Sequence, residues 1–266
     1  MKKHLLLLML VITAVMICSC AVNKTDKVIP ADKSVTHKID DDGAEKASEK
    51  KEESEWDRIV KDKKILVGIS DREFNRRLVE ELKPEMGMDV EITQFASFDD
   101  AAEALKNKDI DMYIGEFPKE SKRSLEFALS DAYIQGTSVI IGKSEDYKVD
   151  KNKDVAGVIR GSAEEKTVDL YFNEYLGFSS YYELFSALNS GKISCVFIDE
   201  NEYEKSGFKR EDLYVCDSYV YNLIAIFNEQ CTDVASKMNV YLAKVKASGV
   251  ASEISEEVYG KDVIYK

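Results

Sequence analysis

From residue 57 onward, apolar and polar residues follow one another in short blocks that predict alternating strands and helices. Short apolar or alternating runs predict strands, and apolar residues spaced three or four apart predict helices with one buried face. Strand, helix, strand, helix, strand is the order typical of a parallel sheet with helices on its faces. In the first half of this region the predicted strands are 64–69, 90–95 and 110–114, and the predicted helices are 76–82 and 98–106.

The second half of the region repeats this arrangement. A strand is predicted at 155–159, and Gly161 and Ser162 stand at the start of a predicted helix over 163–175. A second helix and an apolar strand at 193–198 follow. Backbone N–H groups are free at the first turn of a helix, so an anion-binding position is expected at the Gly161-Ser162 turn.

Helix ends are marked by residues suited to capping. Ser97 precedes the helix at 98–106, and a serine hydroxyl satisfies a free N–H at a helix start. Ser180 and Glu183 form the pattern of a capping box, and Gly191 suits the end of the same helix. These signals place a helix between residues 180 and 191.

The two halves match most closely where a helix leads into a strand. Ala104 precedes its strand by the same spacing as Ala187 precedes the strand at 193–198. By this alignment Glu116 and Asp199 hold equivalent positions, just past the carboxyl ends of two core strands. Ligands of open parallel sheets bind at that edge. Both carboxylates are therefore candidate binding residues.

An α/β fold of two Rossmann-like lobes follows from this repeat. Two strands, near 133–141 and 223–227, are expected to cross between the lobes as a hinge. Lobe 1 is predicted to comprise residues 57–133 and 229–266, and lobe 2 residues 134–228. Solute held between such lobes stabilises the closed form through its higher affinity for it.

The N-terminus predicts export. Residues 1–19 combine two lysines with an apolar run that is shorter than the roughly 20 residues of a membrane-spanning helix, as in a signal peptide. Cys20 follows a small residue in a lipobox-like pattern, which predicts a lipid anchor, whereas the alternative is an ordinary secretory peptide cut nearby. Residues 20–55 hold no aromatic residue and are expected to form a disordered tether.

Charge and composition exclude several classes of function. The formal net charge of −13 disfavours binding to nucleic acid and to anionic lipid. The two histidines, His4 and His37, precede the predicted lobes, which removes most general-base and zinc-site schemes. We therefore expect no metal, no cofactor and no enzymatic activity.

The lobes contain three cysteines. Cys195 lies inside an apolar run and is expected to be buried as a small hydrophobic residue. Cys216 and Cys231 could pair in an oxidising compartment, but their spacing alone leaves the pairing open.

The ordered series of motifs resembles family 3 of the bacterial extracellular solute-binding proteins, the polar amino-acid receptors of ABC importers. The resemblance covers about 200 residues. It implies a fold like the type II periplasmic binding proteins. Its main motifs are Ile65-Leu66-Val67-Gly68, Asp109-Ile110-Asp111, Ser130-Asp131-Ala132-Tyr133, Val158-Ile159-Arg160-Gly161-Ser162, Ala187-Leu188-Asn189-Ser190-Gly191 and Val196-Phe197-Ile198-Asp199.

The resemblance also implies a set of ligand-binding residues. Arg123 stands seven residues before Ser130, where the family arginine grips the ligand carboxylate, and a guanidinium fork suits that task. Ser162 and Gly161 would complete the carboxylate site from the other lobe. Asp199 matches the family aspartate that accepts the ligand ammonium group. The competing interpretations are a surface arginine, a capping serine and a loop aspartate.

The chain departs from the family pattern in its first lobe. The segment between Ser70 and Leu78 is shortened and lacks the usual aromatic wall, for which Phe74 is the nearest substitute. Acidic residues stand at Glu116 and Glu120, where the family has a glycine and a threonine. Extra carboxylates raise the cost of binding a simple anion and favour a ligand with a cationic side chain.

The leading hypothesis is thus a monomeric, lipid-anchored substrate-binding protein of an ABC importer, on the extracellular face of the cell membrane. In a host with an outer membrane it would be periplasmic. It would bind a small polar solute, an amino acid, and present it to an ABC permease. The alternative is a surface lipoprotein whose solute-binding domain is degenerate or sensory. An enzyme, using a carboxylate pair such as Glu116 and Glu120, is the third class.

Overall fold

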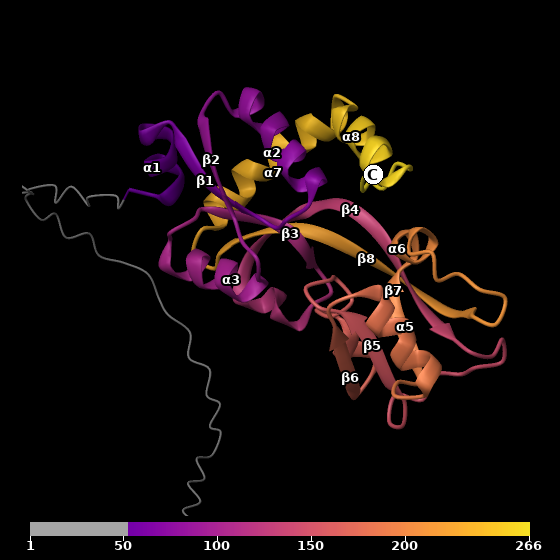
Figure 1. Ribbon diagram of the computed structural model, residues 1–266. Coiled ribbons are helices and arrows are strands. Elements are labelled where there is room, and N and C mark those ends of the chain that lie inside the picture. The colour runs from indigo at the N-terminus through magenta and orange to yellow at the C-terminus, as the bar shows by residue number, and fades with distance from the viewer. Residues whose placement is uncertain (1–52) are drawn as a thin grey trace, which may run out of the picture. The chain divides into compact units, whose positions relative to one another are not determined.

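The computed structural model describes residues 53–266 (Figure 1). One sheet of eight strands runs through it in the order β2-β1-β3-β8-β4-β7-β5-β6. The strands are β1 (Lys64–Ile69), β2 (Asp89–Gln94), β3 (Met112–Pro118), β4 (Phe127–Gly142), β5 (Val155–Ile159), β6 (Glu174–Phe178), β7 (Cys195–Asp199) and β8 (Tyr214–Asn228). The helices are α1 (Glu55–Asp62), α2 (Glu73–Met86), α3 (Phe98–Asn107), the 3-10 helix η1 (Lys122–Glu126), α4 (Val168–Tyr171), α5 (Tyr181–Ser190), α6 (Glu200–Lys205), α7 (Thr232–Ala247) and α8 (Val250–Tyr259).

The long strands β4 and β8 pair antiparallel and connect two lobes. Their register runs from Phe127 opposite Asn228 at one end to Gly142 opposite Tyr214 at the other. On one side β3 joins β8 and is followed by the parallel strands β1 and β2, which form lobe 1 with α1–α3, η1, α7 and α8. On the other side β7 joins β4 and is followed by β5 and β6, which form lobe 2 with α4–α6. The predicted two-lobed α/β fold with a two-strand connection is confirmed, and the exact lobe boundaries stay a prediction.

Lobe 1 buries both faces of its half-sheet. On one face α2, α7 and α8 enclose a core that includes Phe74, Leu78 and Leu82 of α2 (Figure 1). On the other face α3 covers a second cluster around Phe117 and Phe127. Covering both faces explains why β1 is nearly continuous in apolar residues.

The segment between β5 and α5 differs from the predicted helix at 163–175. The structure has turns after β5, where Gly161 takes a φ of +81°, and then only the four residues of α4 (Val168–Tyr171). Strand β6 follows and pairs along its whole length with β5. Backbone pairing at the sheet edge satisfies the end of this segment, so Tyr175 lies in a strand instead of a helix. The helix prediction is wrong, and with it the expected helix start at Ser162.

Helices α1 and α6 are among those not predicted from the sequence. Helix α1 begins at Glu55, two residues before the predicted start of lobe 1, and Ser54 and Asp57 cap it reciprocally. Helix α6 follows β7 directly, with Asp199 as its N-cap. The second helix matters for function because it fixes the end of β7.

The cysteines of the two lobes are free thiols. Cys195 is buried, as predicted. The part of β8 from Cys216 to Asn228 alone spans roughly 40 Å at about 3.3 Å per residue, and Cys231 lies beyond it. A disulfide needs Cα atoms within about 7 Å, so the pairing of Cys216 with Cys231, left open by the sequence, does not form.

The predicted signal peptide, lipid-bearing Cys20 and most of the predicted tether lie outside the described residues. Within residues 53–266, no helix is both long and apolar enough to cross a membrane.

Candidate functional site

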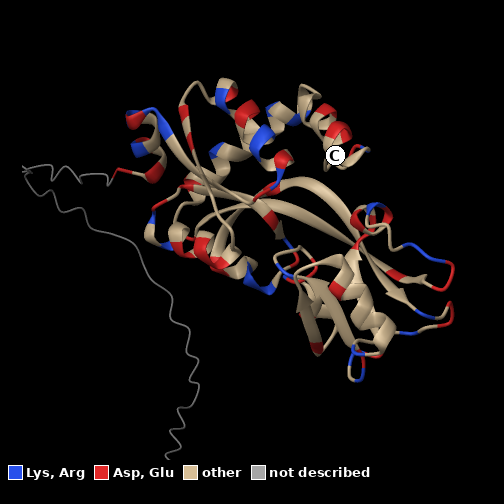
Figure 2. Ribbon diagram, in the orientation of Figure 1, with Lys and Arg blue, Asp and Glu red and all other residues tan. Residues whose placement is uncertain are grey.

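A cavity of about 100 Å³ lies where the two lobes face each other, at the carboxyl ends of β3 and β7 and against β4 and β8. Ligand pockets commonly have volumes of about 300–1,000 Å³, so this cavity is small. Figure 2 shows acidic segments on β3 and α6 at this junction. The charged residues that line the cavity are Arg72, Glu116, Glu164, Asp199, Glu202 and Lys261.

Arg72 crosses the cavity from lobe 1 to lobe 2. It precedes α2, and its Nη2 donates to one carboxylate oxygen of Glu116 on β3 at 3.2 Å, while its Nε lies 3.0 Å from the other oxygen as an ion pair. Its Nη1 lies 3.6 Å from a carboxylate oxygen of Glu202 on α6, in lobe 2. The Glu116 charge is the largest cause that raises the pKa of Arg72, which keeps the guanidinium charged. The side chain of Arg72 therefore contacts carboxylates of both lobes.

Asp199 lies at the end of β7 and is held by two donors. One carboxylate oxygen accepts the backbone N–H of Glu202 at 3.0 Å, as the cap of α6. The other accepts the hydroxyl of Tyr221, on β8, at 2.9 Å. Burial is the main cause that raises the pKa of Asp199, against the lowering effect of these hydrogen bonds. A cation in the cavity would stabilise this carboxylate in its ionised form.

Glu164 is a buried carboxylate in the turn that follows β5. Its side chain accepts the Ser138 hydroxyl at 2.6 Å, and the residue lines the cavity. Its pKa is raised from the ordinary 4.5 to about 7, mainly by burial and also by the nearby charges of Asp199 and Glu116, against the lowering effect of the Ser138 hydrogen bond. The cavity thus holds an acid that titrates near neutral pH.

This acid predicts a specific dependence of stability on pH. The folded protein holds the Glu164 proton more tightly than the unfolded chain, so the free energy of unfolding falls as pH rises from 4.5 to about 7. A Glu164→Gln variant should lack this fall, which amounts to about 3 kcal/mol at most. Urea unfolding of both proteins at pH 5 and pH 8 measures it. Glu253→Gln, on exposed α8, serves as control, and parallel pH profiles for wild type and Glu164→Gln would contradict the assignment.

Three of the residues predicted from the sequence line the cavity: Glu116, Ser162 and Asp199. Ser162 accepts the backbone N–H of Glu165 at 3.2 Å, and so caps a turn instead of a helix. Gly161 lies beside it, outside the lining, with its own N–H donated to the Glu165 carboxylate at 2.6 Å. One backbone N–H group of this turn, that of Gly161, is therefore already bonded to the Glu165 carboxylate.

The other three lie elsewhere. Arg123, in η1, donates to Asp99 at 2.6 Å and to Glu126 at 2.8 Å, with its guanidinium 4.7 Å from the Phe98 ring centre. The structure does not bring Arg123 to the cavity, and its role as a carboxylate clamp stays a prediction.

Phe74 and Glu120 are also outside the cavity lining. Phe74 is fully buried in α2, where it stacks on Tyr133 and lies against Tyr259, a residue of the cavity wall. Glu120 accepts the backbone and side-chain N–H groups of Asn222 on β8, at 3.1 and 2.8 Å. Phe74 therefore packs behind Tyr259 of the cavity wall. Glu120 links the segment after β3 to β8 through Asn222.

Carboxylates outnumber basic side chains in the lining of the cavity. The lining has two basic residues, Arg72 and Lys261. It has four acidic residues, which are Glu116, Glu164, Asp199 and Glu202. Tyr181, Tyr221 and Tyr259 add aromatic surface, which suits the apolar part of an organic cation. Among residues 53–266 no group of three or more His, Cys, Asp or Glu residues has metal-ligand geometry. Arg72, Glu164 and Glu202 were missed by the sequence, although Arg72 closely follows the end of β1, at the expected ligand edge.

Comparison with known proteins gives one family. The sequence pattern of the bacterial extracellular solute-binding proteins, family 3, matches residues 59–261. No curated protein matches the chain in sequence.

Solved structures share the fold at low sequence identity. An ABC uptake transporter substrate-binding protein from Streptococcus pneumoniae with bound histidine has a TM-score of 0.61 and 18% identity, covering 79% of this chain and 98% of its own. The arginine-, lysine-, histidine-binding protein ArtJ of Geobacillus stearothermophilus has a TM-score of 0.56 and 22% identity, covering 75% and 96%. The GluR0 ligand-binding core of Nostoc punctiforme with L-glutamate has a TM-score of 0.60 and 15% identity, covering 73% and 99%. At these identities the likeness establishes the fold alone.

Proposed function

The chain belongs to family 3 of the bacterial extracellular solute-binding proteins, and on that premise we propose that it binds a small cationic solute, an amino acid with a basic side chain, for an ABC importer. The observation that carries the proposal is the excess of carboxylates around the cavity. A guanidinium or ammonium group in such a site can donate charge-assisted hydrogen bonds to the carboxylate oxygens. A simple anion would meet uncompensated negative charge.

Asp199 and Glu164 are the proposed partners of the solute cation. Both lie in lobe 2, both face the cavity, and both are anchored by hydroxyl donors, from Tyr221 and Ser138. Anchored carboxylates keep their positions without a solute, so less order has to be gained on binding. The names of two structural relatives, with arginine, lysine or histidine as ligands, agree with this class, whereas the GluR0 core holds glutamate.

The proposal includes anchoring and transport. Cys20 would carry the lipid that holds the protein at the membrane surface, and an ABC permease would receive the solute from the closed form. No chemistry on the solute is required, and we propose that the protein acts as a monomer. Fatty-acid labelling that persists in a Cys20→Ala variant would contradict the anchor.

A second candidate function is solute sensing without transport. The fold is shared with the GluR0 ligand-binding core. The small volume of the cavity also agrees with a domain that binds a signalling solute or that no longer binds one. Association of the solute-loaded protein with an ABC permease would support transport, and its absence would support sensing.

Thermal unfolding of the fragment 51–266, screened against the twenty amino acids and common polyamines, tests the binding proposal. A solute at one hundred times its dissociation constant adds about 2.7 kcal/mol of stability. We expect lysine, arginine or a related cation to raise the midpoint by several degrees, and glutamate and aspartate to leave it unchanged. A shift produced only by an anionic or uncharged solute would overturn the cationic assignment.

A further inference from the structure

Arg72 makes contacts inside the cleft that a cationic solute would make. Its guanidinium contacts Glu116 of lobe 1 through one hydrogen bond of 3.2 Å and an ion-pair contact of 3.0 Å, and it lies 3.6 Å from Glu202 of lobe 2. We infer that Arg72 acts as an internal counter-ion that holds the lobes closed without solute, and that a solute enters by displacing it. The displacement rests on the proposed cationic function, whereas closure by Arg72 does not.

Other ion pairs also connect the lobes, but they are more exposed. Lys122 pairs with Asp169 at 2.6 Å with side chains 61% and 46% exposed, and Lys261 pairs with Glu200 at 3.5 Å with side chains 47% and 48% exposed. Exposed pairs contribute little to stability because water screens them. The Arg72 partners, Glu116 and Glu202, are only 22% and 29% exposed. The pair of Arg72 with Glu202, with side chains 40% and 29% exposed, is therefore the least exposed ion pair that connects the lobes among the described residues.

Opening the lobes would change the surroundings of Arg72 in one direction. Glu116 is on its own lobe and would remain its partner, whereas Glu202, Asp199 and Glu164 would move away with lobe 2. Without Arg72 between them, the carboxylates of the two lobes would repel one another across the cleft. Removing the arginine should therefore favour the open form.

Displacement by a solute is geometrically simple. The Arg72 side chain is 40% exposed, so it can rotate to water while the solute, whose cation pairs with Asp199 and Glu164, also supplies positive charge near Glu116 and Glu202 in the same cavity. Binding would then exchange one cation for another and leave the charge of the cleft unchanged. Competition of this kind lowers the apparent affinity of the solute. A variant without Arg72 should bind the same cation more tightly at equilibrium.

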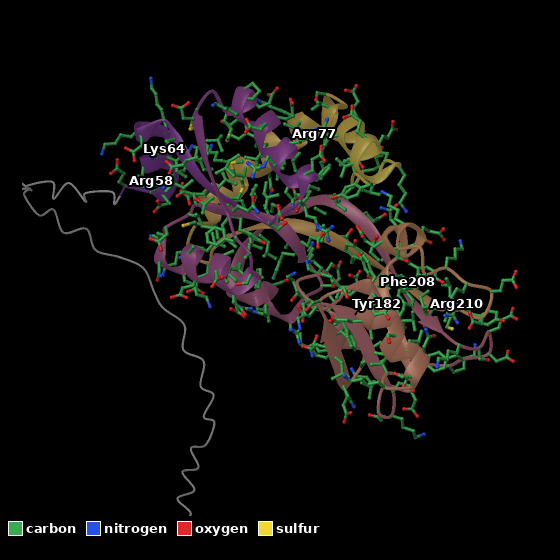
Figure 3. All side chains as sticks on the ribbon, viewed as in Figure 1. Arg58, Lys64, Arg77, Tyr182, Phe208 and Arg210 are labelled. Atoms are coloured by element: carbon green, nitrogen blue, oxygen red, sulfur yellow. The ribbon has the colours of Figure 1, made fainter. Side chains whose placement is uncertain are left out.

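Pulsed EPR distances between spin labels on the two lobes test the closure. Glu80→Cys on α2 and Tyr182→Cys on α5 place exposed labels on opposite lobes; Figure 3 labels Tyr182 on lobe 2 and Arg77 on lobe 1. Among the cysteines of residues 53–266, Cys216→Ser removes the accessible thiol, since Cys195 and Cys231 are buried.

Solute-free protein should give a short distance that Arg72→Leu lengthens. Glu202→Gln, which retains the arginine, should lengthen it too, and guards against misfolding of the first variant. Arg77→Leu is the matched control, because Arg77 pairs with Glu73 and Glu257 within lobe 1 and should leave the distance unchanged. A long distance in solute-free wild type, or one that neither cleft variant changes, overturns the inference.

Titration of the same variants with L-arginine separates this inference from the proposed function. Arg72→Leu should bind L-arginine about tenfold more tightly than wild type, equivalent to about 1.4 kcal/mol. Loss of binding in Arg72→Leu would make Arg72 a direct solute ligand and contradict displacement. If wild type and Arg72→Leu both fail to bind any cation while the EPR distances behave as expected, the proposed function fails and the closure stands.

Discussion

Replacing Asp199 by asparagine is expected to weaken binding of the cationic solute about 100-fold, or about 2.7 kcal/mol. Asparagine has the shape of aspartate and still accepts the N–H of Glu202 at the start of α6, so the fold should change little. It removes the charge at the cavity wall, and a buried charge left without its partner costs about 2–5 kcal/mol. Isothermal titration of both proteins with the solute found in the thermal screen measures the difference.

Asp217→Asn provides a matched control for this experiment. Asp217 accepts the hydroxyl of Tyr219 at 2.8 Å, much as Asp199 accepts that of Tyr221, but it lies on an exposed part of β8 outside the cavity. Its variant should bind like wild type. Equal losses in both variants would indicate a long-range charge effect, and an Asp199→Asn protein with unchanged affinity would remove Asp199 from the site.

Replacing Phe74 by alanine should lower the free energy of unfolding by about 3–5 kcal/mol, the range of Phe→Ala changes in protein cores. The ring is fully buried, with its centre 6.4 Å from that of Tyr133 and 5.5 Å from that of Tyr259. The cavity left in the core would remove contacts of both tyrosines. Urea unfolding at constant pH measures the loss.

The same variant decides between two roles of Phe74. Resemblance to the family assigns it to the aromatic wall of the site, whereas its position in the core of lobe 1 makes it a packing residue. Tyr182→Ala, an exposed aromatic residue of α5, should change stability by no more than about 0.5 kcal/mol. A Phe74→Ala protein with unchanged stability and lost solute binding would favour the wall.

Much of the fold could be predicted because apolar periodicity and capping residues act locally. Helix α3 begins after Ser97, and α5 runs from Ser180 to a left-handed Gly191, as their cap signals predict. The helix prediction for 163–175 was wrong because the segment contains enough apolar residues for a helix. Its end instead pairs as β6 with β5, a strand some distance away in the sequence. Periodicity in a single segment does not reveal such a partner.

Two residues of the site were predictable because the sequence repeats itself. Alignment of the two halves placed Glu116 and Asp199 at equivalent strand ends, and both line the cavity. Arg123 was assigned by spacing from a family motif, and local carboxylates hold it elsewhere. Arg72 was missed because its partners, Glu116 and Glu202, come from two other elements, and ion pairs between lobes leave no periodic pattern in the sequence.

The most direct test of the central claim is a pair of calorimetric titrations of the fragment 51–266 with L-arginine and L-citrulline. These two amino acids are close in size and shape, but only arginine carries a side-chain cation. A cleft lined by Glu164, Asp199 and Glu202 should bind arginine with measurable heat and citrulline at least tenfold more weakly, a difference of about 1.4 kcal/mol. Equal affinity for the two, or tighter binding of citrulline, would contradict recognition of a cationic solute.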